Sequence, residues 1–292
     1  MKDPLVSIII PNLNNQERLA HCLEAVCQQS FRSGAVEIIV VDNGSTDHST
    51  EVCRNYPVQL LVETAHQSPY WCRNAGIAAA RGSVIALLDS NCIPVNDWLA
   101  QGVNDLEKTK AAIITGPVLY SFSSKRTLAE RIDYLYSYIS IEDLPHLTAL
   151  SAGHLFFRKS LIDEIGYFLP HIRSLGDIEW TQRAYQQGHT FGFAEGAKVH
   201  YPAKTLIPVV RKMVRLGGGR KALWRAKGRP LYSVDWMWQI GKNLLPPSPA
   251  FFQEMNYRNR KERMEVPMLF LFLGLWLVKV CRAWGMMFRN GN

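Results

Sequence analysis

Two polar residues, Asp89 and Asn91, follow directly on a short apolar run in the stretch VIALLDSN. A carboxylate oxygen and an amide oxygen at this spacing can both ligate a divalent cation, and such a cation can bind the phosphates of a charged substrate. Two carboxylates would bind the cation more strongly, because the amide oxygen carries no formal charge. The pair therefore indicates a weaker metal site than two aspartates would make.

Two further polar loops also follow apolar runs that are typical of buried strands. PNLNN follows VSIII, and DNGSTD follows VEIIVV. Each loop by itself indicates only a turn, because Asn, Asp, Ser and Gly favour turns. In an open parallel sheet, however, ligands bind at the carboxyl ends of the strands, so we expect the three loops to meet at one site. Asp42, the first residue of DNGSTD, can accept hydrogen bonds from a nucleobase or a ribose.

The order of the expected elements predicts an α/β domain. Strands expected at 6–11, from 36, at 58–64 and at 83–89 alternate with helices at 16–29, after Asp47 and at 74–82. This alternation is typical of a parallel sheet with helices on both faces. Beyond residue 100 we expect a strand at 111–120, a strand running into a helix over 151–168, and a helix over 177–188. Asp177 begins that last helix, where the helix dipole alone would favour a carboxylate.

Glycine and cysteine patterns exclude several familiar sites. The loop after the first strand has no glycine, unlike a GxGxxG dinucleotide site, and the chain contains no GxxxxGK[ST] phosphate loop. The GGGRK at 217–221 follows no strong strand, so we expect it to give flexibility. The six cysteines form no CxxC pair, which argues against structural zinc and favours a reducing, cytosolic setting. The stretch MKDPLVSIIIP lacks the pattern of a signal peptide.

The last third of the chain differs from the rest in charge. Residues 203–292 contain 17 Lys and Arg and 4 Asp and Glu, a net charge of +13, whereas residues 1–202 contain 16 and 21, a net of −5. Basic segments bind nucleic acid, anionic lipid or phosphorylated ligands. The tryptophans of this segment form no recognised nucleic-acid module, so we expect no nucleic-acid partner. An anionic membrane surface is the expected partner.

An apolar stretch near the C-terminus supports that expectation. Residues 268–278, MLFLFLGLWLV, would cross only about half of a bilayer, and Lys279 and Arg282 follow them. The tryptophans at 276 and 284 and the flanking cations suit a membrane interface. We expect residues 268–288 to lie on the membrane or to insert shallowly. Docking on the rest of the chain and a true membrane span are the alternatives.

Four blocks of the sequence, in this order and spacing, resemble glycosyltransferase family 2. They are VSIIIPNLNN, EIIVVDNGSTDHST, RNAGIAAARGSVIALLDSNCIP and GDIEWTQRAYQQG, and the resemblance runs from about Val6 to His200. It implies the GT-A fold, with a mostly parallel central sheet and helices on both faces. The implied catalytic domain covers residues 1–202, with a nucleotide-binding part at about 1–110 and an acceptor-binding part at about 111–202. Residues 203–292 would be a basic, helical C-terminal extension.

The resemblance also implies an activity. Members are hexosyltransferase-like enzymes that move a sugar from a nucleotide-diphospho-sugar, with inversion, to a hydroxyl group of a glycan or lipid-linked acceptor, as in polysaccharide biosynthesis. We expect such a reaction at the cytosolic face of a membrane, with a cytoplasmic protein bound peripherally. The alternative is a catalytically impaired nucleotide-sugar-binding protein or a membrane scaffold.

Site residues are implied by the same resemblance. Asp177 matches the catalytic base, in a GDIE motif where Gly176 stands at a position that is frequently Glu. A carboxylate in that role takes the proton of the attacking hydroxyl. The implied nucleotide-binding residues are Pro11, Asn12, Asn14, Asp42, Arg73, Asn74 and Asp89. The implied metal positions are Asp89 and Asn91, which occupy the acidic places of a DxD motif, together with His200.

Three interpretations of Asn91 follow. The first is weak binding of Mn²⁺ or Mg²⁺, shared with the diphosphate of the sugar donor. The second is transfer without a metal, with Arg or Lys side chains from residues 211–221 neutralising the diphosphate. The third is a protein that binds the nucleotide sugar without turnover. The presence of Asp177 argues against the third.

Overall fold

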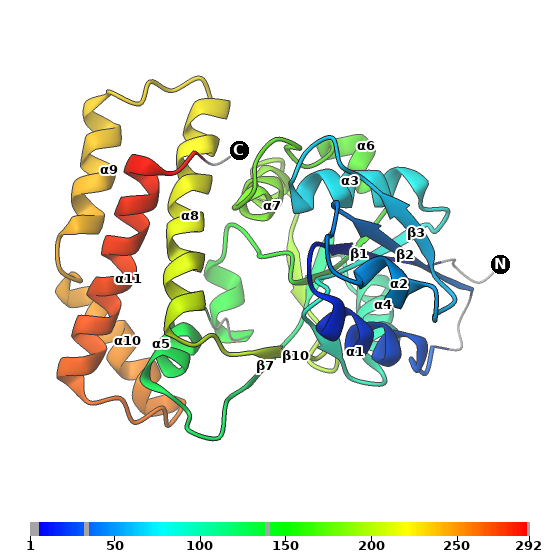
Figure 1. The fold of residues 1–292 in the computed structure, drawn as a ribbon, viewed down its shortest axis with the longest axis horizontal. Helices are drawn as coiled ribbons and strands as arrows, with labels where there is room; N and C mark the ends of the chain where they lie inside the picture. Colours follow the sequence, from blue (N-terminus) through cyan, green and yellow to red (C-terminus); the bar gives the residue numbers. More distant parts are fainter. Residues whose placement is uncertain (1–5, 32–34, 138–140, 291–292) are drawn as a thin grey trace. The chain divides into compact units, whose positions relative to one another are not determined.

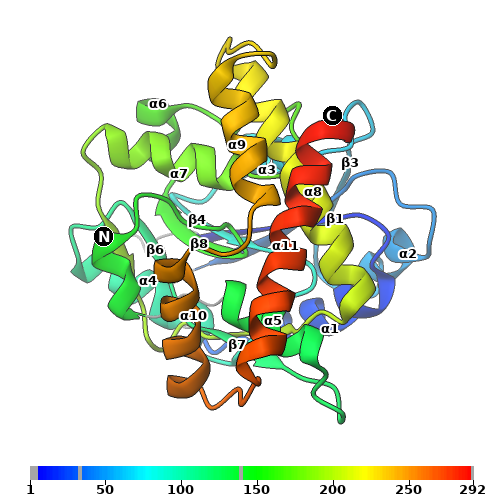
Figure 2. The same cartoon turned by 90° about the vertical axis from the view of Figure 1, so that its left-hand side faces the viewer.

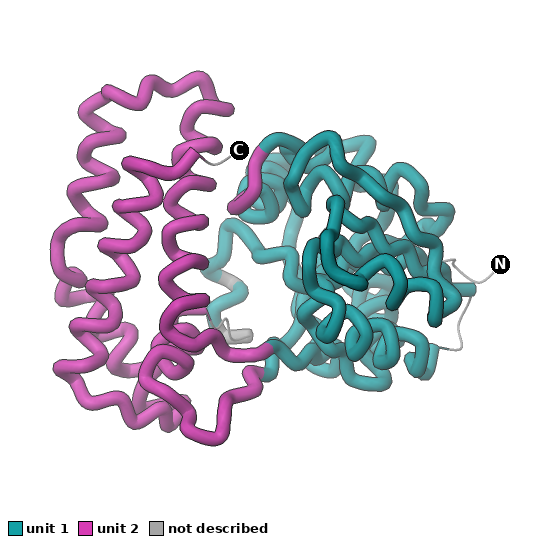
Figure 3. The backbone as a smooth tube through the Cα atoms, in the orientation of Figure 1, with its two compact units in different colours: residues 1–119, 139–171, 176–201 teal, residues 120–138, 172–175, 202–292 magenta. Residues whose placement is uncertain are grey.

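The chain folds into two compact units in the structure, a computed structural model that describes residues 6–31, 35–137 and 141–290. Unit 1 comprises residues 1–119, 139–171 and 176–201, and unit 2 comprises residues 120–138, 172–175 and 202–292 (Figure 3). All of the expected site residues belong to unit 1.

Unit 1 is built on a seven-stranded sheet with the order β3-β2-β1-β4-β8-β6-β9. Figure 1 labels β1, β2 and β3 of this sheet. The strands β1, β2, β3 and β4 run parallel, β8 is antiparallel to β4 and β6, and β9 is parallel to β6. The expected α/β class with a mostly parallel sheet is therefore confirmed. The strands are β1 (Val6–Asn12), β2 (Val36–Asp42), β3 (Gln59–Val62), β4 (Val84–Leu88), β6 (Ile113–Thr115), β8 (His154–Arg158) and β9 (Phe191–Phe193).

Helices cover both faces of this sheet, as the sequence predicted. Because side chains alternate along a strand, Ile8 and Ile10 of β1 pack against one set of helices and Ile9 against another. Ile8 and Ile10 join one core with side chains of α1 and α4. On the opposite face Gly76 of α3 contacts Ile9, and a β-carbon at position 76 would overlap that side chain. The helices of unit 1 are α1 (Gln16–Cys27), α2 (Ser49–Cys53), α3 (Pro69–Ala79), α4 (Trp98–Lys108), α6 (Leu161–Ile165) and α7 (Gly176–Gln186), with a 3₁₀ helix at Ile141–His146.

Two expected elements differ from the structure. The helix expected at 74–82 begins earlier, at Pro69, because Ser68 caps it by accepting hydrogen bonds from two backbone N–H groups and proline suits the first helical position. The strand expected at 111–120 is two strands, β6 and β7 (Val118–Ser121). They separate at Gly116, which lies against backbone carbonyls of Ala194 and Ala197. The strand β7 belongs to a second sheet of order β5-β10-β7, with β5 at Ile93–Pro94 and β10 at Val199–Pro202.

Unit 2 is helical, and α9, α10 and α11 face the viewer in Figure 2. Its helices are α5 (Leu128–Ser137), α8 (Leu206–Ala226), α9 (Val234–Leu244), α10 (Pro249–Lys261) and α11 (Met268–Phe288). The expectation that GGGRK gives flexibility is wrong, because these residues lie inside α8. Gly217 packs directly on Gly285 and on the carbonyl of Arg282 in α11. A side chain at 217 would therefore force the two helices apart.

The helix α5 begins with a capping box that fixes a buried carboxylate. Glu130 is 2% exposed and accepts hydrogen bonds from the backbone N–H and the hydroxyl of both Ser123 and Thr127, at 2.7–2.8 Å. Burial alone would raise the pKa of Glu130, but these hydrogen bonds favour the charged form and lower the pKa to about 2.

We expect Glu130→Gln to lower the free energy of unfolding at pH 7 by about 1–2 kcal/mol, because it removes a charged cap. The folded-state pKa of Glu130 lies below its ordinary value of 4.5, so this stabilisation is present above pH 4.5 and is lost as the pH falls towards 2. Urea unfolding at pH 7 and at pH 3 measures the difference, which should shrink at the lower pH. The matched control is Glu254→Gln, which removes an exposed carboxylate bonded to Arg258, and it should change stability much less. An unchanged stability of Glu130→Gln at pH 7 would contradict the assignment.

Candidate active site

The loops after β1 and β2 form one hydrogen-bonded framework. Asn12 and Asp42 are the last residues of these strands and are paired in register. The carboxylate of Asp42 accepts hydrogen bonds from the N–H groups of Gly44 (3.0 Å) and Ser45 (2.7 Å), from the Ser45 hydroxyl (2.6 Å) and from Asn12 Nδ2 (3.1 Å). Asp42 therefore builds the loop on which any nucleotide contact would depend.

Asn14 joins the same two loops from the other side. Its backbone has a positive φ of 48°, its Oδ1 accepts from Thr46 N–H at 2.7 Å, and its own N–H donates to Ser45 Oγ at 2.8 Å. Pro11 is buried within β1. Asn12 Oδ1 is also buried, and no residue that the structure describes donates a hydrogen bond to it. A buried acceptor of this kind calls for a hydrogen-bond donor from a ligand or solvent.

Arg73 lies at the centre of a second group of contacts. Its side chain is 4% exposed, and Nη2 donates to Asp89 Oδ1 at 2.6 Å and to the Ala152 carbonyl at 3.2 Å. Burial alone would lower the pKa of Arg73, but the neighbouring Asp89, Tyr70 and Asp177 raise it, so the guanidinium stays charged. Asn74, the next residue, is not part of this group. Its side-chain amide instead holds the backbone of Phe168 through two hydrogen bonds.

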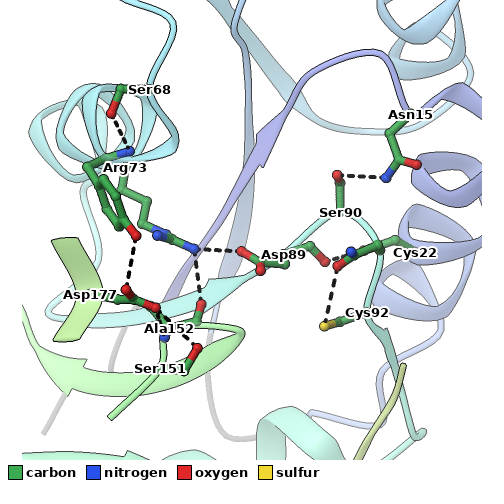
Figure 4. A network of polar contacts seen from close by, with 12 residues as sticks. Asn15, Cys22, Ser68, Arg73, Asp89, Ser90, Cys92, Ser151, Ala152 and Asp177 are labelled. Carbon is green, nitrogen blue, oxygen red and sulfur yellow. Dashed lines mark hydrogen bonds and ion pairs between the residues drawn. The ribbon is translucent and has the colours of Figure 1, made fainter. Parts of the chain in front are cut away.

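Asp177, the second residue of α7, is held by three hydrogen-bond donors. Oδ1 accepts from the Tyr70 hydroxyl at 2.9 Å, and Oδ2 accepts from Ser151 Oγ at 3.1 Å and from Ala152 N–H at 3.0 Å. Ala152 thus donates to Asp177 and accepts from Arg73, so a single peptide segment links the two side chains (Figure 4). The structure brings Arg73, Asp89 and Asp177 into one network.

The three expected metal positions lie on two neighbouring segments. Asp89 and Asn91 follow β4, and His200 of β10 is paired with Ile93 of β5, two residues beyond Asn91. His200 is exposed and Asn91 is half-buried. Within the described ranges, no group of three or more His, Cys, Asp or Glu could hold a metal ion by itself. A cation at these positions would need ligand oxygens from a substrate.

Tyr70, Ser151 and Ala152 were not predicted as site residues. Tyr70 could have been found from the sequence, because the Ser68–Pro69 pair marks a helix start and places Tyr70 and Arg73 one turn apart on the same face. No comparable signal exists for Ser151 and Ala152, which lie in an irregular segment before β8. Their role comes from tertiary contacts alone.

Comparison with known sequences gives a consistent result. The sequence model of the family described as Glycosyl transferase family 2 matches residues 7–166. The matched segment contains the two polar loops and the DSN stretch, and it ends before Asp177 and His200. Glycosyltransferase AglE of Haloferax volcanii is 30% identical over 259 residues, which are 86% of this chain and 84% of that protein. An uncharacterized glycosyltransferase of Haemophilus influenzae is 31% identical over 147 residues, 46% of this chain and 57% of that protein.

Solved structures with a similar fold include two that contain nucleotide sugars. The mannosyltransferase PcManGT from Pyrobaculum calidifontis, in complex with GDP-Man and Mn²⁺, has a TM-score of 0.57 at 14% identity over 94% of this chain and 74% of that one. TarS residues 1–349 of S. aureus, in complex with UDP-GlcNAc, has a TM-score of 0.53 at 18% identity over 74% of this chain and 66% of that one. At such low identity these similarities concern the fold, and they confirm the expected GT-A fold.

Proposed function

The chain belongs to glycosyl transferase family 2, and on that premise we propose that it is an inverting enzyme that moves a sugar to a hydroxyl group of a glycan or lipid-linked acceptor. It is a glycosyltransferase that uses a nucleotide-sugar donor. The observation that supports inversion is the fixed carboxylate of Asp177. Three hydrogen bonds hold it next to the ion pair of Arg73 and Asp89. A fixed carboxylate beside the expected diphosphate loop is what a general base in single-step inversion requires.

In the proposed step, Asp177 takes the proton of the acceptor hydroxyl while that oxygen forms a bond to the anomeric carbon. The bond from that carbon to the diphosphate oxygen breaks, and its electron pair leaves with the nucleoside diphosphate. The framework of the β1 and β2 loops would hold the nucleotide, and the buried Asn12 Oδ1 would accept a hydrogen bond from it. Asn14 and Asp42 shape these loops, Pro11 lies within β1 just before the first of them, and Asn74 holds the backbone of Phe168.

A metal ion fits the site only with help from the substrate. A bound Mn²⁺ or Mg²⁺ would offset the charge that develops on the leaving diphosphate. Asp89, Asn91 and His200 are the residues that would hold it. Arg73 already hydrogen-bonds one oxygen of Asp89, and residue 91 is a neutral amide, so the protein offers little anionic charge. We therefore propose a weak site that the diphosphate oxygens complete.

Membrane association is proposed from the surface of unit 2. The helix α11 is the one helix, among the described residues, that is long and apolar enough to cross a membrane. It packs Leu271, Leu275 and Val278 into the unit, which argues for a helix that lies along a membrane surface. Five of its exposed apolar residues recur at helical spacing, and three exposed apolar residues of α9 do the same. They are Leu269, Leu273, Leu277, Trp284 and Phe288 of α11, and Val234, Met237 and Trp238 of α9.

We expect Asp177→Asn to slow turnover severely and to leave binding of the sugar donor nearly unchanged, because an amide keeps the size but cannot accept the proton. The rate should fall by about 10²–10⁴-fold. The measurement is release of UDP from UDP-GlcNAc and of GDP from GDP-mannose, with binding followed by thermal shift. The matched control is Glu179→Gln, two residues along α7, where the carboxylate is bonded to Arg183. A wild-type rate in Asp177→Asn with a loss in Glu179→Gln would move the base to Glu179.

Asn91→Asp should lower the cation concentration that half-maximal activity requires, by about ten-fold, because the new carboxylate adds charge to the metal site. A Mn²⁺ titration of the same release assay measures this concentration. The control is Asn55→Asp, which makes the same change at an exposed position in the loop after α2 and should leave the titration unchanged. Full activity in EDTA together with a slower Asn91→Asp variant would instead support transfer without a metal.

Replacing Leu273 and Leu277 together by Glu should greatly weaken sedimentation of the full chain with vesicles of phosphatidylcholine and phosphatidylglycerol. Both side chains are exposed, so the fold of unit 2 should persist. Binding of the wild-type chain should also weaken with salt, since each basic residue near the surface contributes about 1 kcal/mol that ions screen. The control pair is Val62→Glu and Tyr167→Glu, two exposed apolar positions of unit 1. Equal sedimentation of the α11 variant and the wild type would contradict the proposal that this face of α11 binds the membrane.

A further inference from the structure

Tyr70 is a buried residue with one polar contact to the candidate base. It is 4% exposed, and its hydroxyl donates to Asp177 Oδ1 at 2.9 Å. Its ring is stacked with Phe168 at a centroid distance of 6.0 Å and an interplanar angle of 22°. The guanidinium of Arg73 lies over the same ring, 5.3 Å from its centroid. The ring is therefore fixed from several sides, and so is the direction of its hydroxyl.

Gly176, the residue before the candidate base, packs directly against this ring. A β-carbon at position 176 would lie 2.7–2.9 Å from three carbon atoms of Tyr70. Real β-carbons do not approach other carbons so closely, and the ring cannot move without leaving Phe168 and Arg73. The space next to position 176 is therefore filled by a tyrosine from α3.

The hydrogen bonds of Asp177 leave one oxygen better suited to take a proton. A carboxylate oxygen has two lone-pair sites. Both sites of Oδ2 are used by Ser151 and Ala152, whereas Oδ1 accepts one hydrogen bond, from Tyr70, among the described residues. Burial and the charge of Asp177 raise the pKa of Tyr70, so the phenol stays protonated and keeps donating.

We propose that Tyr70 is a positioning residue that orients Asp177 and directs the second lone pair of Oδ1 towards the acceptor hydroxyl. This inference rests on the proposed function of Asp177 as the base. The proton of the acceptor moves to Oδ1, and the proton of Tyr70 stays on its own oxygen. Tyr70 and Gly176 form a matched pair, so that neither can change without cost while the other remains.

Tyr70→Phe tests the hydroxyl because it keeps the ring and its packing. We expect kcat for release of UDP from UDP-GlcNAc, or of GDP from GDP-mannose, to fall about 10–100-fold, as small misplacements of a reacting group do. KM for the sugar nucleotide should stay near the wild-type value. The control is Tyr134→Phe in unit 2, which removes a comparable tyrosine–carboxylate bond of 2.7 Å to Glu262. Both variants should lose similar stability in thermal melts, and only Tyr70→Phe should lose kcat.

Two further variants separate this inference from the proposed function. In the Asp177→Asn background, adding Tyr70→Phe should cause no further loss of rate, because Tyr70 acts through Asp177. If Asp177→Asn is inactive and Tyr70→Phe keeps the wild-type kcat, positioning by Tyr70 is wrong and the base assignment stands. If Asp177→Asn keeps the wild-type kcat, the assignment of Asp177 as the base fails, and the inference about Tyr70 fails with it.

The close contact between Gly176 and the Tyr70 ring can be tested separately. Gly176→Ala should lower the melting temperature of the wild-type chain, because its methyl group meets the Tyr70 ring. In a Tyr70→Ala background, which removes the ring, the same substitution should cause little further change. Equal effects of Gly176→Ala in both backgrounds would overturn the pairing of these two residues.

Discussion

The candidate site depends on one buried positive charge, the guanidinium of Arg73. Burying a charged guanidinium costs free energy unless charged and polar groups surround it. Arg73 contacts Asp89, the Ala152 carbonyl and the face of the Tyr70 ring. These partners come from the end of β4, the segment before β8 and α3 itself. The same segment and the same helix supply all three hydrogen-bond donors to Asp177, namely Ser151, Ala152 and Tyr70. The position of the candidate base is thus tied to that of the loop expected to face the diphosphate.

This arrangement is compatible with the proposed site, which has one carboxylate in its DSN loop. Arg73 keeps Asp89 in a defined orientation, and Asn91 adds no charge that would have to be neutralised before a substrate binds. In the proposed reaction the diphosphate brings its own negative charge, and a weakly held cation would arrive with it. The contacts of Arg73 with Asp89 and Ala152, which all lie in unit 1, offset the free energy that burying its charge costs.

The parts of the fold that follow from local pattern could be predicted from the sequence. β-Branched runs ending in polar loops gave the strands β1, β2 and β4, and parallel pairing then brought Asn12 beside Asp42. Tertiary contacts decided the rest. The glycines of α8 resembled a flexible loop, but the close approach of α11 requires them within a helix. The helix start at Ser68–Pro69 could have placed Tyr70 beside Arg73, but its contact with Asp177 could not be predicted, because Asp177 lies more than a hundred residues further along the chain.

The proposed inversion can be measured from the configuration of the released sugar. UDP-GlcNAc and GDP-mannose are both α-linked, so a single displacement assisted by Asp177 must form the β-anomer first when water is the acceptor. Proton NMR, recorded before the free sugar equilibrates, distinguishes the two anomers by their C1 proton signals. With inversion, the β-anomer appears first and then decays towards the equilibrium mixture. An α-anomer that forms first would contradict a single displacement with Asp177 as its base.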